Sequence, residues 1–285
     1  MSPKTMLRNK LNRPGSLIVR LLVYTSALIA MSAIVFLILY ILIKGIPHLS
    51  PELFSWKYTS ENVSMMPAII NTLSVTVIAL IISIPLGVFA AVYLVEYAKK
   101  GNKLVKLVRI TAETLTGIPS IIYGLFGMLF FVRTLGWNYS ILAGSCTVAI
   151  MVLPVIMRTT EEALLSVPDT YREGSFGLGA GKLRTVFRVV LPPAMPGILS
   201  GIILSIGRIV GETAALIYTA GSVTSAPKNV FSPGRTLAVH MYSLSREGLH
   251  VEQAYATAVV LVIIVIIINS LSGLAAKKIG KVSGK

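Results

Sequence analysis

Residues 158–197 read RTTEEALLSVPDTYREGSFGLGAGKLRTVFRVVLPPAMPG, a polar and glycine-rich stretch between two long apolar runs. Ser166 has a proline and an acid within three residues after it, the pattern of a helix that begins at a capping serine. The glycines after Phe176 would end that helix. A second short basic helix would then follow and end at Pro192-Pro193. We therefore expect two short helices joined by a glycine turn, outside the membrane, where a partner protein could contact them.

The composition of the whole chain is that of an integral membrane protein. Of its 285 residues 54% are hydrophobic and 13% are charged, and the mean hydropathy is +0.80. These values exclude a disordered chain and disfavour a water-soluble enzyme, which usually carries about 25% charged residues. A helix needs roughly 20 apolar residues to cross the hydrocarbon core. Six runs meet this requirement, so we predict an all-α protein with spans near Leu17–Ile43, Ala68–Val95, Thr111–Val132, Ser140–Met157, Pro196–Ala220 and Ala254–Leu274.

The basic residues predict how these spans are oriented. Lys and Arg number 26 against 11 acidic residues, a net charge of +15. Nineteen of the 26 fall in the two tails, in the connections after the second and fourth spans, or at the start of the first span, where Arg20 lies. The positive-inside rule then places both termini in the cytoplasm, and it explains the charge without a nucleic-acid partner. The expected organisation is a cytoplasmic tail 1–16, a membrane domain 17–276 and a cytoplasmic tail 277–285, with external loops at about 44–67 and 222–253 and a cytoplasmic loop at about 158–193.

The fifth span carries charge inside an apolar run. Arg208 would lie about 12 residues from each end of this span, and Glu212 would follow one helical turn later on the same face. Ionisable residues inside a membrane are costly and usually functional. On a continuous helix they share a small and polar stripe, which should line a protein interior or an aqueous path: Gly201, Ser205, Arg208, Glu212, Ala215 and Thr219. The alternative is a purely structural pair in which each charge neutralises the other.

Other polar or helix-breaking residues have simpler interpretations. Pro85 and Pro154 are expected only to kink their spans, whereas the stretch 117–120 (Gly-Ile-Pro-Ser) is rich enough in breakers to unwind. The three histidines fall in predicted external loops and are expected to be solvated. The single cysteine, Cys146, excludes an intrachain disulfide and a cysteine metal site. No metal, cofactor or catalytic residue is predicted, and the GLGAGKLRT stretch lacks the first glycine and the Ser/Thr of a phosphate-binding loop.

The cytoplasmic loop resembles the EAA loop of ATP-binding-cassette (ABC) importer permeases, E-A-A-x3-G-x9-I-x-L-P. Four positions match outright and three are small or aliphatic replacements: Glu173, Gly179, Leu191 and Pro192, and Gly174, Ser175 and Val189. The resemblance implies a six-helix permease domain of the type I (MetI-like) importer class. It also implies that the loop from Glu173 to Gly179 docks on a separate ATPase, so that the chain itself is not an enzyme.

Four further stretches resemble one branch of these permeases, the PstA-type subunit of phosphate importers. They are IPLGVFAAVYLVEYA (84–98), TGIPSIIYGLFG (116–127), GRIVGETAAL (207–216) and RTLAVHMYSLSREG (235–248). The resemblance implies a homologous second permease (PstC-type), two ATP-binding subunits and an extracytoplasmic phosphate-binding protein. It also ties Arg208 and Glu212 to phosphate passage, in a multi-pass protein of the cytoplasmic membrane that works by alternating access.

Two alternatives stay open at this stage. A permease for sulfate, molybdate or another oxyanion would carry the same EAA-like loop. A secondary transporter would share six spans and intramembrane charge, but it would not need that loop.

Overall fold

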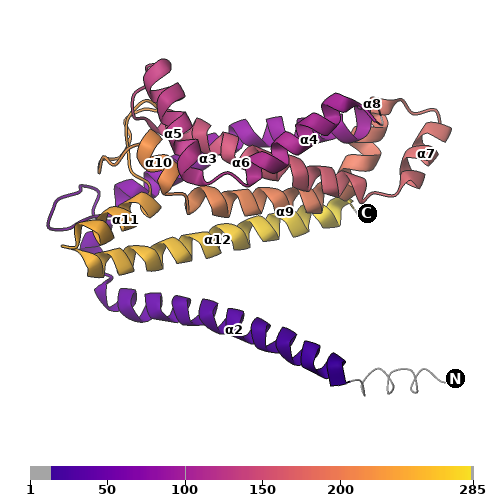
Figure 1. Cartoon of the computed structure of the whole chain (residues 1–285). Coiled ribbons are helices and arrows are strands. Elements are labelled where there is room, and N and C mark those ends of the chain that lie inside the picture. Colours follow the sequence, from indigo (N-terminus) through magenta and orange to yellow (C-terminus); the bar gives the residue numbers. More distant parts are fainter. Residues whose placement is uncertain (1–13, 100, 284–285) are drawn as a thin grey trace.

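The computed structural model describes residues 14–99 and 101–283 of the chain. Most of the predicted N-terminal tail and the last two residues of the predicted C-terminal tail lie outside the described residues. The described part is helical, and Figure 1 shows its elements. The main helices are α2 (Pro14–Gly45), α3 (Met66–Val92), α4 (Lys103–Thr116), α5 (Ser120–Gly127), α6 (Ile141–Leu165), α7 (Asp169–Gly177), α8 (Lys182–Thr185), α9 (Leu191–Val210), α10 (Ala214–Thr219), α11 (Leu237–Glu247) and α12 (Val251–Ser283).

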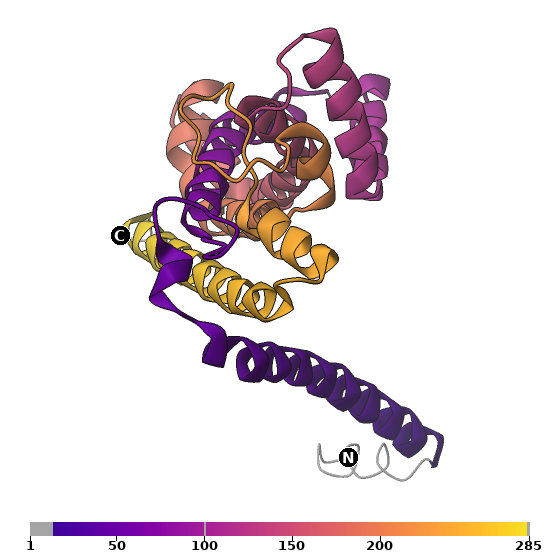
Figure 2. The ribbon, with the colours of Figure 1, turned by 90° about the vertical axis from the view of Figure 1, so that its left-hand side faces the viewer.

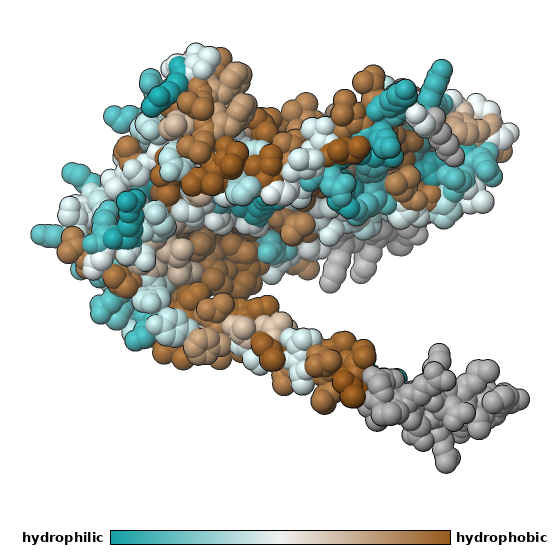
Figure 3. All heavy atoms as spheres, in the orientation of Figure 1, coloured by the Kyte–Doolittle hydropathy of each residue, from teal (hydrophilic) through white to brown (hydrophobic). Residues whose placement is uncertain are grey.

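Five continuous helices are long and apolar enough to cross a membrane, and a sixth crossing is possible if a bent pair counts as one span. This agrees with the predicted all-α class. Helices α3, α4, α6, α9 and α12 lie along one common direction, with α7 and α8 at one end and α11 at the other (Figure 1). Helix α12 ends on the α7 side, and the first described turn of α2 lies on that side too. Apolar surface dominates α2 and the middle of the molecule, while hydrophilic residues gather towards the ends (Figure 3).

The predicted third span is not one helix. Helices α4 and α5 meet at an angle of 104°, with the break at residues 117–119. Pro119 has no N–H and an extended ψ of 140°, and it disfavours helical geometry at the residue before it. The expected unwinding of this stretch is thus observed, whereas the continuous span Thr111–Val132 is wrong. Pro85 and Pro154 stand inside α3 and α6 without ending them.

The predicted fifth span is wrong at both ends. A continuous helix runs from Lys182 to Val210, and α10 follows only after a break at residues 211–213. Pro192-Pro193 therefore do not end a helix. The π-helical turn η5 (Val186–Val190) comes directly before them. Proline has no N–H, so neither proline can donate to the carbonyl four residues before it. The wider π-helical turn accommodates these carbonyls without ending the helix.

The start of the cytoplasmic element also differs from the prediction. Ser166 does not cap α7, because its hydroxyl donates to the carbonyl of Ala163 at 2.7 Å and so closes α6. Helix α7 begins after Pro168 instead. The preceding helix α6 extends eight residues beyond its predicted end and stops at Leu165. The loop predicted at 158–193 therefore contains only a short irregular stretch on each side of α7.

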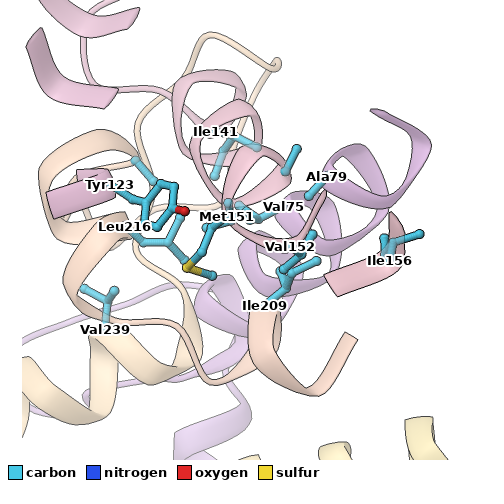
Figure 4. Close-up of a cluster of buried hydrophobic side chains, with 13 residues drawn as sticks. Val75, Ala79, Tyr123, Ile141, Met151, Val152, Ile156, Ile209, Leu216 and Val239 are labelled. Carbon is cyan, nitrogen blue, oxygen red and sulfur yellow. The ribbon is translucent and has the colours of Figure 1, made fainter. Parts of the chain in front are cut away.

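The core forms where α3 and α6 pack together with α5, α9 and α10. Figure 4 shows Val75 and Ala79 of α3 facing Met151 and Val152 of α6, with Leu216 of α10 beside them. These five residues are at most 1% exposed. Helix α2 makes no such core: its side chains from Ile18 to Leu39 are exposed, and it diverges from the other helices in both views (Figures 1 and 2).

His240 was expected in a solvated loop, and this is wrong. It lies in α11, is 0% exposed, and meets the ring of Tyr58 edge-on. Burial disfavours the imidazolium and the nearby Arg235 repels it, which together lower the pKa of His240 to about 3. The residue is therefore a neutral part of the packing at the α11 end of the molecule.

Gly87 lets α3 approach α6 closely. A β-carbon at this position would lie 2.9 Å from Cγ2 of Ile156 and 3.3 Å from the backbone nitrogen of Met157. Gly87→Ala should therefore destabilise the protein by about 1–3 kcal/mol, because the helices must separate. Gly273→Ala in α12 is the matched control, since nothing lies within 4 Å of its β-carbon position. Thermal unfolding in detergent should show the control unchanged or stabilised. Equal effects of the two substitutions would contradict close packing at Gly87.

Candidate translocation site and coupling element

Arg208 lies in the last turn of α9, next to a break in the chain. It is the third residue from the end of α9, rather than the middle of a long span, and it is half-buried. No carboxylate of the described residues lies within ion-pair distance of its guanidinium. A half-buried guanidinium without a carboxylate is able to bind an oxyanion through its planar fork of donors.

The side chain of Glu212 bonds to the backbone of α10 and not to Arg208. It lies in the break after α9 and is 8% exposed. Its Oε1 accepts a hydrogen bond from the backbone N–H of Ala215 at 3.0 Å, at the start of α10. The purely structural pair with Arg208, which was the alternative interpretation, is therefore not formed, because the two residues do not share one helix. Glu212 instead satisfies an N–H group that would otherwise be unpaired at the first turn of α10.

Ser205 and Thr219 do not lie on an exposed stripe with Arg208. Both are 0% exposed. The Ser205 hydroxyl donates to the carbonyl of Gly201 at 2.9 Å, and that of Thr219 donates to Ala215 at 2.8 Å. Their hydroxyls are thus satisfied within their own helices. The small and polar set does not lie along one continuous helix, because the chain breaks at residues 211–213, but its members do face the protein interior. Arg208 is the one charged member of the set that stays partly accessible.

The two chain breaks lie side by side. Gly124 of α5 packs on α10, where a β-carbon would come within 2.8 Å of the Cα of Ala215. Tyr123 is buried beside it, and its hydroxyl donates to the carbonyl of Leu115 at 2.7 Å. The role of Tyr123 in closing the first break was not predicted from the sequence, because it depends on the folded geometry.

A cavity of about 630 Å³ begins at the second break. Its walls are mainly apolar and come from the break and α10, from α11, from α12 and from Ile41 of α2. Thr213, which directly follows Glu212, lines it together with three polar residues of α11: Tyr242, Ser245 and Arg246. The cavity therefore reaches the second break at Thr213, while Arg208 and Glu212 do not line it.

The coupling element is an exposed helix with a glycine turn. Helix α7 carries Glu173, Gly174 and Ser175, and none of its residues is buried. Gly179 has a φ of +81°, which is left-handed backbone that residues with a side chain rarely adopt. The Ser175 hydroxyl lies 2.8 Å from that of Thr185, which ties α7 to α8. Leu191 and Pro192 lie away from this turn, at the start of α9.

Large apolar side chains are exposed around the coupling element. Leu178 is 90% exposed and Leu183 is 65% exposed. A surface hollow of about 550 Å³ lies between α7 and α8 and includes Tyr171, Gly174 and Gly179. Exposed apolar surface of this kind, at an end of the molecule that is otherwise polar, is typical of a protein docking site.

The sequence of this chain is similar to those of known membrane transport proteins. Residues 83–281 match the family of binding-protein-dependent transport system inner membrane components. A Bacillus subtilis protein named as a probable ABC transporter permease, YqgI, is 37% identical over 273 residues, which are 89% of this chain and 91% of that protein. The phosphate transport system permease protein PstA of Mycobacterium leprae is 36% identical over 73% of this chain and 70% of its own length.

Solved structures show the same fold. The inward-facing methionine importer MetNI contains a chain with a TM-score of 0.59 and 24% identity, covering 73% of this chain and 93% of that one. A chain of a bacterial alginate ABC transporter, solved with its alginate-bound periplasmic protein, has a TM-score of 0.64 at 17% identity and covers 90% and 95%.

Glu212 offers a test of the second break. Glu212→Ala removes the acceptor for the Ala215 N–H and should lower stability by about 1 kcal/mol, the usual cost of losing a helix cap. Glu212→Gln keeps a side-chain oxygen at the same place and should stay near wild type. Thermal unfolding of the two purified variants in detergent measures the difference. If Glu212→Gln is as unstable as Glu212→Ala, the carboxylate does more than accept this hydrogen bond.

Proposed function

Since this chain belongs to the family of binding-protein-dependent transport system inner membrane components, and is thus the permease subunit of an ABC importer, we propose that its cargo is inorganic phosphate. Members of this family are multi-pass membrane proteins that leave ATP hydrolysis to a separate subunit. The proposal for phosphate is supported by relatives named as PstA permeases, which are 36–37% identical over about three quarters of the chain. The observation that carries it is the half-buried Arg208 without a carboxylate partner.

In this proposal Arg208 lowers the barrier that hydrocarbon presents to an anion. Its guanidinium lies at a break in the helix, where the backbone can change direction and where a cavity begins at Thr213. Charged groups beside broken helices are a common arrangement at transporter sites. Glu212 then acts by holding the first turn of α10 in place beside Arg208. Ser205 and Thr219 contribute through packing, since both are fully buried.

The proposed complex contains a homologous PstC-type permease, two ATP-binding subunits and an extracytoplasmic phosphate-binding protein. Helix α7 and the turn at Gly179 dock on the ATPase in the cytoplasm, so both termini lie on that side. The binding protein delivers phosphate at the opposite end, where α11 and the loops before it lie (Figure 1). ATP-driven closure of the ATPase pair then moves α7, and the spans alternate access around Arg208.

Replacing Arg208 tests the role in phosphate passage. Arg208→Gln should lower phosphate uptake by the reconstituted complex about 10- to 100-fold, because hydrogen bonds between charged groups contribute about 1.5–3 kcal/mol and the anion would lose this stabilisation. Co-purification of the subunits and ATP binding should persist. Arg133→Gln, at an exposed arginine of the α5–α6 connection, is the matched control and should leave uptake unchanged. Normal phosphate uptake by Arg208→Gln would remove Arg208 from the mechanism.

The same uptake assay addresses the rival cargo. Excess unlabelled phosphate should suppress uptake of labelled phosphate, while sulfate and molybdate should not. Suppression by sulfate or molybdate at equal concentration would favour a permease for another oxyanion.

Gly179 tests the docking of the ATPase. Gly179→Leu forces a side chain into left-handed backbone, at a cost of about 1–2 kcal/mol, and should reshape the turn and weaken ATPase association about tenfold. Gly181→Leu is the control: that glycine has a φ of −72° and open space around it, so the substitution is unstrained. Co-purification of the ATPase with the tagged permease measures the effect. Equal retention of ATPase by both variants would contradict docking through the Gly179 turn.

A further inference from the structure

One buried ion pair joins the coupling helix to a distant transmembrane helix. Arg172 of α7 contacts Glu96, which lies 76 residues earlier in the π-helical turn η3 (Tyr93–Tyr97) at the end of α3. The Nη2 of Arg172 donates to Oε1 of Glu96 at 2.7 Å, and Nε donates to the same oxygen at 3.1 Å. The side chains are 14% and 7% exposed, so water screens this pair far less than a surface pair.

The remaining donors of Arg172 are also satisfied by fixed groups. Nη1 donates to the carbonyl of Val167 at 2.8 Å, and Nη2 donates to that of Leu164 at 3.0 Å. Nη1 also reaches Oδ1 of Asp169 at 3.1 Å, but the Asp169 side chain is 82% exposed. One guanidinium thus connects the end of α6, the start of α7 and the end of α3. The planar guanidinium fixes the relative positions of its N–H donors and thus of these groups, which a lysine ammonium would not.

Helix α7 has few other connections to the membrane part of the molecule. None of its residues is buried, and its main contacts are with α8 and η5, which directly follow it in the chain. A second contact reaches the same π-helical turn as Glu96, where Nζ of Lys182 lies 5.0 Å from the centre of the Tyr97 ring. These two contacts of the α7–α8 unit therefore reach the same turn, η3, at the end of α3.

We propose that Glu96 is a positioning residue of the transport cycle, which makes α7 and the cytoplasmic end of α3 move as one body. This inference rests on the proposed function, because it takes α7 to be the element that the ATPase moves. Movement of α7 reaches α6 and α9 directly along the chain. It reaches α3 through Arg172 and Glu96. Without Glu96, α6 and α9 move while the cytoplasmic end of α3 lags behind, so ATP is hydrolysed without transport.

The test compares the two carboxylate partners of Arg172 in the complete reconstituted importer with its binding protein. Glu96→Gln removes the buried charge, whereas Asp169→Asn removes the exposed one. Phosphate transported per ATP hydrolysed should fall about tenfold in Glu96→Gln and stay near wild type in Asp169→Asn, since exposed pairs contribute little. ATPase co-purification and ATP hydrolysis should stay within about twofold of wild type in both variants. Arg188→Met, at an exposed arginine of η5, is a further control.

A rescue experiment separates transmission of movement from a merely structural role. Glu96→Cys and Arg172→Cys are combined with Cys146→Ser, and a short bifunctional thiol reagent then joins the two positions. Cross-linking should restore the ratio of transport to hydrolysis, and leaving the thiols free should keep it low. An unchanged ratio in Glu96→Gln, a low ratio after cross-linking, or loss of the ATPase from Glu96→Gln would each overturn the proposal.

The experiments test the role of Glu96 separately from the identity of the transported anion. If the wild-type complex imports another oxyanion and not phosphate, the proposed cargo is wrong, and the Glu96 variants are scored with that oxyanion instead. If wild type and Glu96→Gln import phosphate with the same ratio to ATP, the cargo stands and the role of Glu96 is wrong.

Discussion

A lipid interior offers no hydrogen bonds, so every backbone group inside it must find a partner within the protein. This constraint explains why the described spans are helical and where they can be interrupted. The carbonyl of Leu115 would normally accept from residue 119, but Pro119 has no N–H. The Tyr123 hydroxyl and the N–H of Ile118 bond it instead. At the second break, Ala215 would bond the carbonyl of Gly211 in a continuous helix, and the Glu212 carboxylate accepts its N–H.

The two breaks therefore depend on buried side chains, and this links stability to function. Gly124 places α5 against α10, so the groups that close both breaks lie in one region. At the second break Glu212 accepts the Ala215 N–H with one carboxylate oxygen and lies outside ion-pair distance of Arg208. Arg208 therefore has no carboxylate partner among the described residues.

At the end of the molecule where α7 lies, π-helical turns redirect the chain. The π-helical turn η5 carries the helix past Pro192 and Pro193, so α8 and α9 form one continuous rod from the coupling element to Arg208. The π-helical turn η3 ends α3 and presents Glu96 to Arg172. Both turns redirect helices without leaving backbone groups unpaired. The coupling helix, which has no buried residue of its own, is connected to the membrane helices through these two turns.

Composition, hydropathy and the spacing around Glu173 and Gly179 were sufficient to predict an all-helical permease, because long apolar runs and glycine turns act locally. The break at Pro119 could also be predicted, since proline restricts the backbone of the residues next to it in the chain. The break between Arg208 and Glu212, the burial of His240 and the pairing of Glu96 with Arg172 were not. The contacts of His240 and Glu96 join residues far apart in the chain, which meet only when the helices pack. Periodicity assumes that a helix continues, whereas a nearby side chain such as Glu212 can satisfy the backbone and allow it to break.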